Sequence, residues 1–254
     1  MESSMSCGQM LKYSLSKLVM EFVGTMVFTI FFVAGGQTTI LLGLWILNIF
    51  FWKISGSHFN PAVTLAFMLR RDEKRLSWKI GVAYIVAQLL GAYAGALLSN
   101  FYTFALPILI YVKGEWLRAI LQELLCSFLF VFFFMITTDD KLLFSEEKAI
   151  NCFILASSYI GARSIFYGTT ETITLYYGAV MNPAVALGIQ LASIFSCHEY
   201  DERSALEAMY LYPTVPFGAA FLAVLFYEFI YKKTQAFLHH EDEPISDDGL
   251  GEHD

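Results

Sequence analysis

The sequence predicts an all-α, polytopic membrane protein with six transmembrane helices and two half-spanning re-entrant helices. The chain of 254 residues is 57% hydrophobic and only 15% charged, and its mean hydropathy is +0.56. The triplet Asn-Pro-Ala occurs twice, and each copy opens an apolar run that is too short to cross a bilayer. The two halves of the chain also resemble each other, which indicates an inverted repeat.

Six stretches are long and apolar enough to span the hydrocarbon core. They are interpreted as helices, because only helices and closed barrels satisfy every backbone polar group in lipid, and the alternating pattern of barrel strands is absent. The second stretch follows a Gly-Gly pair almost without a loop. The six stretches are 17–37, 38–54, 78–100, 116–137, 148–168 and 208–231.

The two triplets, Asn60-Pro61-Ala62 and Asn182-Pro183-Ala184, each predict the start of a helix inside the membrane. Asn is a strong N-cap, and Pro is favoured at the first helical position. The helices that follow, 61–69 and 183–194, would be ~14–18 Å long at ~1.5 Å per residue, which is about half of a ~30 Å hydrocarbon core. Irregular backbone at this depth is tolerated only where it is buried in protein or lines a water-filled cavity. The two short helices therefore indicate a pore.

Each half of the chain has an intramembrane glutamate near its start and a triplet further along. Glu21 lies near the start of the first stretch and Glu123 near the start of the fourth, and both precede Phe-rich runs. Three spanning helices per half, about 17–100 and 116–233, give the halves opposite orientations, so the N-termini of the half-helices meet near the midplane. Each helix N-terminus carries about half a positive charge, which repels cations. The asparagine side chains can cap with oxygen and direct an NH₂ group at the lumen.

The charge distribution orients the chain. All of the net charge of −7 lies in 241–254, which is typical of a solvated tail, so 234–254 is predicted to be an acidic, disordered cytoplasmic tail. Lys and Arg gather before the first stretch, in 70–79 and after the last stretch, which places both termini in the cytoplasm. Residues 1–16 form the cytoplasmic N-terminus, and 17–233 form one transmembrane domain. The membrane itself, plasma or intracellular, is left open.

These residues resemble those of the major intrinsic protein family, the aquaporins and aquaglyceroporins. The shared set is the two triplets, Ser55-Gly56-x-His58, Glu21, Glu123, Gln88 and Thr137-Thr138-Asp139. The loop around the second triplet is most similar to plant tonoplast intrinsic proteins. The resemblance implies an aquaporin-like bundle that assembles as a homotetramer with one pore per subunit, and it implies that the two glutamates hold loop N–H groups. We expect His58 to line the cytoplasmic half of the pore.

The resemblance also locates a constriction that selects the solute. In the family pattern an Arg follows the second triplet, whereas this chain has Val185. Counting from the triplets without gaps places the other three positions at Ile40, Thr170 and Ala179. The resulting selectivity filter is wide, largely apolar and uncharged.

Arg163 is unusual because it lies within the apolar fifth stretch, two turns before Thr170. A guanidinium at membrane depth costs ~2.5–3.5 kcal/mol on insertion scales. It could be paired with an acid or with backbone carbonyls, lie on the pore wall, or be misregistered in the assigned helix. We expect Arg163 to border the pore and to help exclude cations.

The sequence therefore predicts a passive channel in the lipid bilayer for water and small uncharged solutes such as glycerol or urea, which excludes protons and ions. The alternative is a non-conducting structural or junctional subunit in which Arg163, Lys53 or bulky residues close the lumen. A transporter is less favoured, because no ion-coupling carboxylate is placed at an unwound helix. Enzyme activity, a cofactor, nucleic-acid binding and a metal site are not expected, since no nucleophile–base motif or metal-ligand spacing is present.

Overall fold

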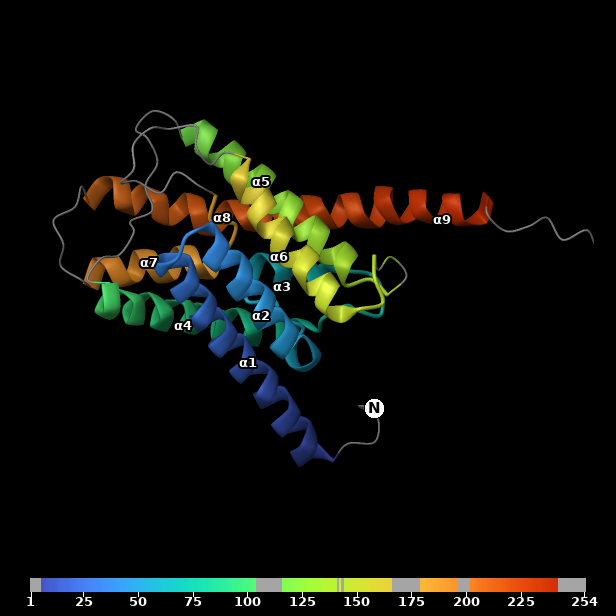
Figure 1. Ribbon diagram of the computed structural model, residues 1–254, viewed down its shortest axis with the longest axis horizontal. Coiled ribbons are helices and arrows are strands. Elements are labelled where there is room, and N and C mark those ends of the chain that lie inside the picture. Colours follow the sequence, from blue (N-terminus) through green and yellow to red (C-terminus); the bar gives the residue numbers. More distant parts are fainter. Residues whose placement is uncertain are drawn as a thin grey trace, which may run out of the picture.

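The computed structural model describes residues 6–103, 116–140, 142, 144–165, 179–195 and 202–241. Regular structure in these residues is helical (Figure 1). The helices are α1 (Cys7–Ala34), α2 (Gln37–Ser55), α3 (Pro61–Leu69), α4 (Trp78–Thr103), α5 (Trp116–Thr137), α6 (Lys148–Ser164), α7 (Pro183–Phe195), α8 (Glu202–Phe226), a π-helical turn (Tyr227–Tyr231) and α9 (Lys232–Glu241).

Five stretches of helix among the described residues are long and apolar enough to cross a membrane. They lie in α1, α2, α4, α5 and the continuous run from α8 to α9, and they match five of the six predicted spans. The sixth predicted span, 148–168, corresponds to α6, which ends at Ser164. Residues 166–178 lie outside the described residues.

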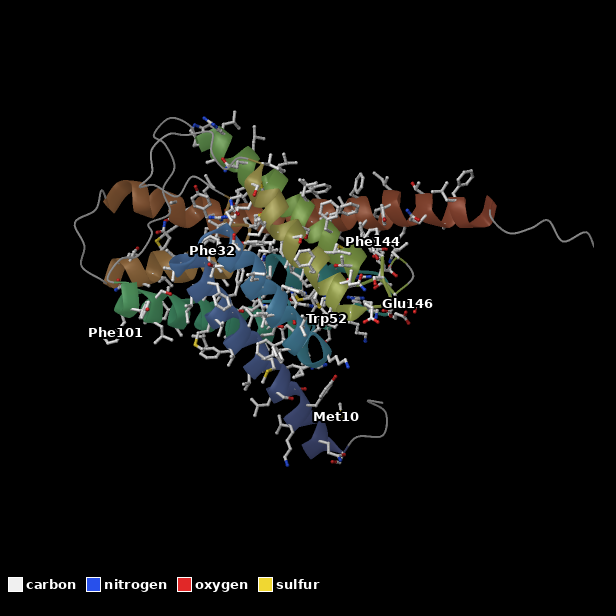
Figure 2. All side chains as sticks on the ribbon, in the orientation of Figure 1. Met10, Phe32, Trp52, Phe101, Phe144 and Glu146 are labelled. Atoms are coloured by element: carbon white, nitrogen blue, oxygen red, sulfur yellow. The ribbon has the colours of Figure 1, made fainter. Side chains whose placement is uncertain are left out.

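Both ends of the described chain carry more helix than the sequence predicts. At the N-terminus, α1 begins at Cys7 because Ser6 and Gln9 form a capping box, with the Ser6 N–H donating to Gln9 Oε1 at 2.8 Å. At the C-terminus, α9 covers 234–241 of the segment predicted to be disordered. The reason is that the acidic run starts only at Glu241, while Lys232 pairs with Glu228 at 3.3 Å one turn earlier and continues the helix. Figures 1 and 2 show α9 and the start of α1, where Met10 is labelled, projecting from the bundle.

The helix contacts follow the internal repeat. α1 packs on α4 as α5 packs on α8, and α1 contacts α2 as α5 contacts α6. α4 packs on the half-helix α7 as α8 packs on the half-helix α3, and α2 contacts α6 across the repeat. Helices α1–α4 are therefore equivalent to α5–α8, and each half-helix is held mainly by the opposite half.

Small residues allow the spanning helices to approach closely. A Cβ atom on Gly91 would lie 2.3 Å from the Phe22 carbonyl oxygen, and one on Gly95 would lie 2.3 Å from the Met26 carbonyl oxygen. α4 and α1 thus touch backbone to backbone, as small residues permit in membrane helices. This contact fixes α1, which carries Glu21, against α4, which in turn packs on the half-helices α7 and α3.

Candidate functional site

The two half-helices begin with the same asparagine cap. Asn60 Oδ1 accepts a hydrogen bond from the Ala62 N–H at 2.8 Å. Asn182 Oδ1 accepts from the Ala184 N–H at 3.0 Å and from the Val185 N–H at 3.3 Å. A proline follows each asparagine at the first helical position, as Asn caps and N1 prolines require. α3 has the predicted bounds, and α7 extends one residue past its predicted end.

The amide groups of the two caps tie the halves of the molecule together. Asn60 Nδ2 donates to the Met181 carbonyl at 2.7 Å, and Asn182 Nδ2 donates to the Phe59 carbonyl at 2.8 Å. Each asparagine therefore binds the residue that precedes the other asparagine. We call these two hydrogen bonds the cross-ties. An amide NH₂ carries two donors, so each cross-tie uses only one of them. The N-termini of α3 and α7 meet at this point, inside the protein.

The residues before each asparagine have strained backbone that buried carboxylates hold in place. Phe59 and Met181 have φ angles of 47° and 56°, in the left-handed region that side chains disfavour. Glu21 accepts from the Phe59 N–H at 2.8 Å, and Glu123 accepts from the Met181 N–H at 2.5 Å. Each carboxylate also accepts the preceding backbone N–H, from His58 at 3.1 Å and from Val180 at 2.8 Å respectively.

Neutral polar side chains surround the first loop. Gln88 Nε2 donates to Glu21 at 2.8 Å and to Thr64 Oγ1 at 2.9 Å. His58 Nδ1 lies 3.2 Å from the same threonine oxygen. The imidazole also packs 4.6 Å from the ring of Phe67 on α3.

A cavity of about 380 Å³ reaches His58 from one end of the bundle. We call this end, where residues 70–77 and Lys232 lie, the basic end. Exposed residues on the cavity wall include Glu146, which is labelled in Figure 2, and Asp140, which forms a 2.5 Å ion pair with Lys74. Further inside, the cavity is bounded by Trp52, Phe67, Thr137, Asn151 and Cys152.

Arg163 lies in the protein interior and contacts the second loop. Its side chain is in the last turn of α6 and the residue is 1% exposed. Nη1 donates to the Ala179 carbonyl at 2.6 Å, and the guanidinium carbon lies 4.5 Å from the centre of the Phe32 ring. The Glu123 carboxylate is near enough to interact electrostatically with it. Of the three interpretations of Arg163, the contact with a backbone carbonyl is present.

Three of the four predicted filter residues are buried in the same core cluster. Ile40 and Ala179 are each 1% exposed and Val185 is fully buried. Thr170 lies outside the described residues, beyond the end of α6 at Ser164. The structure therefore leaves the ungapped count to Thr170 untested.

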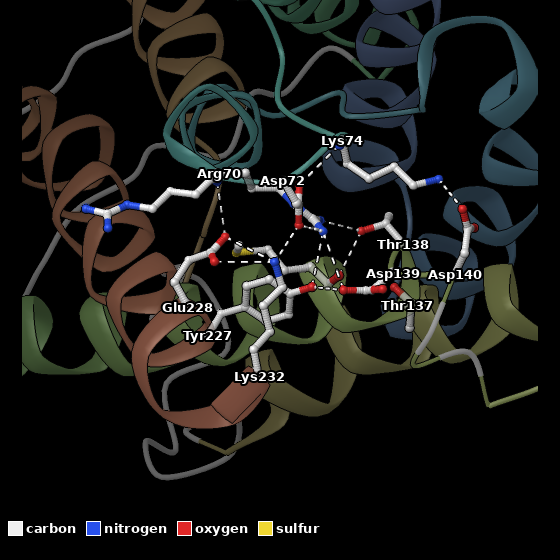
Figure 3. Close-up of polar contacts among 12 residues, drawn as sticks. Arg70, Asp72, Lys74, Thr137, Thr138, Asp139, Asp140, Tyr227, Glu228 and Lys232 are labelled. Atoms are coloured by element: carbon white, nitrogen blue, oxygen red, sulfur yellow. Dashed lines mark hydrogen bonds and ion pairs between the residues drawn. The ribbon is translucent and has the colours of Figure 1, made fainter. Parts of the chain in front are cut away.

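The sequence analysis missed a polar network at the basic end (Figure 3). Arg70, 1% exposed, donates to Asp72 at 2.7 Å, to Thr138 at 3.1 Å and to the Tyr227 hydroxyl at 3.1 Å. Lys232 also donates to Asp72, at 2.6 Å. The network joins the ends of α3 and α5 to the π-helical turn. Its only sequence signal was the Thr137-Thr138-Asp139 run beside a basic loop.

Asp72 is the carboxylate that both cations of this network share. Burial alone would raise the pKa of Asp72, but the hydrogen bonds from Arg70 and Lys232 outweigh that effect and lower the pKa to about 2. The carboxylate is therefore charged throughout the physiological range.

Two short helices whose N-termini meet at cross-tied asparagines, inside an inverted repeat of apolar helices, define a membrane-channel class of fold. The chain matches the family described as "Major intrinsic protein" over residues 9–227, and it belongs to that family.

Individual relatives agree with this assignment. The chain is 32% identical over 147 residues to Aquaporin TIP4-1 of Zea mays, covering 56% of this chain and 52% of that protein. It is 30% identical over 192 residues to Aquaporin PIP2-5 of Oryza sativa subsp. japonica, covering 70% of this chain and 60% of that protein. The matched segments thus span only about half to three fifths of these relatives.

The fold has a solved counterpart in the X-ray structure of the aquaglyceroporin from Plasmodium falciparum. The TM-score is 0.67, with 88% of this chain and 99% of that chain covered at 17% identity. The predicted aquaporin-like, polytopic fold class is confirmed, and the chain is an integral membrane protein.

Proposed function

We propose that this chain forms a passive channel for water and small uncharged solutes and excludes protons and ions. The observation that carries the proposal is the pair of asparagine caps, each of which uses one amide N–H in a cross-tie and retains a second. Both termini would face the cytoplasm, so the basic end would be the cytoplasmic end. Four copies would associate, each with its own pore.

The centre would act on a passing water molecule through the second amide donors of Asn60 and Asn182. A water that accepts from both amides turns its own protons away from the centre, which interrupts a hydrogen-bonded proton wire. The N-termini of α3 and α7 add a positive potential at the same point, because each carries about half a unit charge. Water can cross this barrier, whereas hydronium and metal cations are repelled.

The choice of solute would be made by Ile40, Thr170, Ala179 and Val185. None of these side chains carries charge, and Val185 stands where the family pattern has Arg. A wide, apolar constriction imposes no charge requirement on the solute. We therefore propose that urea or glycerol passes as well as water, and that His58 lines the wide cytoplasmic entrance formed by the cavity.

Arg163 would supply the positive charge that Val185 lacks. The contacts of its guanidinium with the Ala179 carbonyl and the Phe32 ring, and its burial, support this role. We propose that this cation borders the lumen and helps to exclude other cations.

Stopped-flow measurements on reconstituted vesicles test the proposal. Vesicles containing the protein should pass water and at least one of urea and glycerol faster than empty vesicles, with no increase in proton flux. Water flux without urea or glycerol flux would refute the broad filter. Vesicles that pass none of the three would favour the non-conducting structural subunit instead.

A further inference from the structure

Asn48, in the middle of α2, is a buried amide with unmet hydrogen-bonding capacity. The residue is fully buried, and neither its Oδ1 nor its Nδ2 atom has a hydrogen-bond partner among the described residues. A buried polar group left unpaired costs about 1–3 kcal/mol, and native proteins contain few such groups. An amide kept at this depth therefore requires a ligand that the described part of the polypeptide does not supply.

The sides of α2 show where the amide points. Gly43 faces α1, because a Cβ there would lie 2.2 Å from the Phe31 ring. Trp45 faces α6, since its Nε1 donates to the Ala149 carbonyl at 2.9 Å. At about 100° per residue, Asn48 projects about 140° from Gly43 and about 60° from Trp45. Leu44 and Leu47 on the same side of α2 are also buried, so the amide faces the interior of the bundle.

The face of α2 that carries Asn48 also carries residues from both ends of the proposed pore. Ile40, Leu44, Asn48 and Trp52 follow one another at four-residue intervals, so they form one stripe. Ile40 is a proposed filter residue, and Trp52, labelled in Figure 2, bounds the cavity at the basic end. Asn48 thus lies between the filter and the entrance.

Along the axis of α2, Asn48 lies near the level at which the N-termini of α3 and α7 meet. Phe51, one turn further along α2, packs 5.9 Å from the ring of Phe59, the residue that precedes Asn60. The Phe59 carbonyl is the acceptor for Asn182. The stripe of α2 side chains therefore passes the meeting point of the half-helices within about one turn of Asn48.

We infer that Asn48 is a third pore amide, which binds a small neutral hydrogen-bonding molecule, water or a polar solute such as urea, beside the half-helix junction. The inference rests on the proposed channel function. An amide offers both donors and an acceptor, so it can hold a molecule that has already given its acceptor to Asn60 or Asn182. The site replaces part of the hydration that a polar solute loses on entering an apolar pore.

Substitution of Asn48 tests the inference in reconstituted vesicles. Asn48→Leu keeps the side-chain shape but removes the amide, so urea or glycerol permeability should fall about three- to ten-fold, the value of one net hydrogen bond. The melting temperature should stay equal or rise, because no unpaired amide is buried. Thr29→Val is the matched control, since the Thr29 hydroxyl already bonds the Thr25 carbonyl at 2.8 Å within α1. Unchanged permeability in Asn48→Leu would overturn the inference.

A second variant keeps the test decisive if Asn48→Leu fails to fold. Asn48→Cys in a Cys152→Ser background should lose most of its water permeability on addition of mercuric chloride, whereas Cys152→Ser alone should not. A channel that conducts but resists mercuric chloride in Asn48→Cys would place Asn48 outside the lumen. Absence of flux in the unsubstituted protein would instead refute the proposed function itself.

Discussion

The loops that lead into α3 and α7 share their backbone anchors but differ in the side chains around them. In both, a buried glutamate accepts two consecutive backbone N–H groups and an asparagine amide crosses to the other half. The first loop is surrounded by neutral groups, Gln88, Thr64 and His58. In the second loop the Ala179 carbonyl accepts from Arg163 and the Val180 carbonyl accepts from the Tyr159 hydroxyl at 2.8 Å.

We propose that this difference separates the contacts that build the fold from the side chains that would set its selectivity. The glutamate and asparagine contacts are the same in both halves because both half-helices need the same strained entry. The partners of the other loop groups are free to differ, so the repeat is symmetric in its backbone and asymmetric in its charge. One half of the centre carries a fixed cation and the other carries neutral donors and acceptors.

Removal of the shared anchors should have the largest effect. In Glu21→Gln and Glu123→Gln an NH₂ group replaces a carboxylate oxygen and faces a backbone donor, so a buried N–H loses its acceptor at a cost of about 1–3 kcal/mol. We expect both variants to melt at lower temperature in detergent. Melting temperatures equal to that of the Thr29→Val control would contradict the anchoring role.

Conversion of either cap to a carboxylate should open the centre to cations. Asn60→Asp and Asn182→Asp each replace the cross-tie donor with an acceptor and add a negative charge. A unit charge at ~4 Å is worth about 4 kcal/mol at an effective dielectric constant of ~20, so proton or sodium leak should rise more than about tenfold. Ion flux in vesicles provides the measurement. Leak as low as in the unsubstituted protein would argue against electrostatic exclusion at the caps.

Arg163 variants test the asymmetric charge directly. Arg163→Ala should raise cation leak or solute flux while the oligomer still assembles. Arg163→Gln retains a donor for the Ala179 carbonyl but loses the charge, so it distinguishes electrostatics from loop support. Leak in both variants, by several-fold, is the expected result. If Arg163→Gln matches the unsubstituted protein and only Arg163→Ala leaks, the side chain is a loop support and not a cation barrier.

A cysteine at position 179 should report the position of the filter on the second loop. Cys152 bounds the cavity at the basic end, so the background must be Cys152→Ser. In that background Ala179→Cys should lose most of its water permeability to a mercurial, and the background alone should keep it. Inhibition of the Cys152→Ser protein would point to another cysteine, such as the buried Cys126.

The smallest effect is expected where α3 ends, in the Asp72 network. The pKa of Asp72 falls from 3.8 to about 2 on folding, so its contribution is present above pH ~4 and is lost as the pH falls through the folded value. Because Asp72 and its partner Lys232 are both partly exposed, the contribution should be about 1 kcal/mol or less. The melting-temperature difference between the protein and Asp72→Asn should stay constant from about pH 5 to 8 and shrink toward pH 2. A difference that changes around neutrality would indicate another titrating group.

The sequence was most informative where a single residue type dictates the backbone. The Asn-Pro pairs define both half-helix starts, because a capping side chain and a fixed φ act locally. It was least informative where the partner lies far along the chain or where a helix extends past its apolar span. The start of α1 depends on the Ser6–Gln9 capping box, and α9 continues past the apolar span through the Lys232–Glu228 pair and a mixed polar and apolar sequence.

The side-chain partners at the site show the same limit. Residue type alone indicated that Arg163 needed a partner, but the Ala179 carbonyl could be identified only from the folded chain. The unpaired amide of Asn48 gave no signal in the sequence, and the network around Arg70 gave only the Thr137-Thr138-Asp139 run, since each depends on which helices pack together. The roles of the filter residues stay predictions, and Thr170 lies outside the described residues.

The cross-tie between the halves has a consequence for how the protein is made. The Met181 carbonyl that receives the Asn60 amide is 121 residues further along the chain. At ~5–20 residues per second, a ribosome needs about 6–24 s to reach it. During that interval the nascent first half must hold its strained loop with Glu21, Gln88 and Thr64, all of which it already contains. The contacts of the first loop with Glu21, Gln88 and Thr64 can thus form within the first half alone, whereas the cross-tie requires that Met181 has been made.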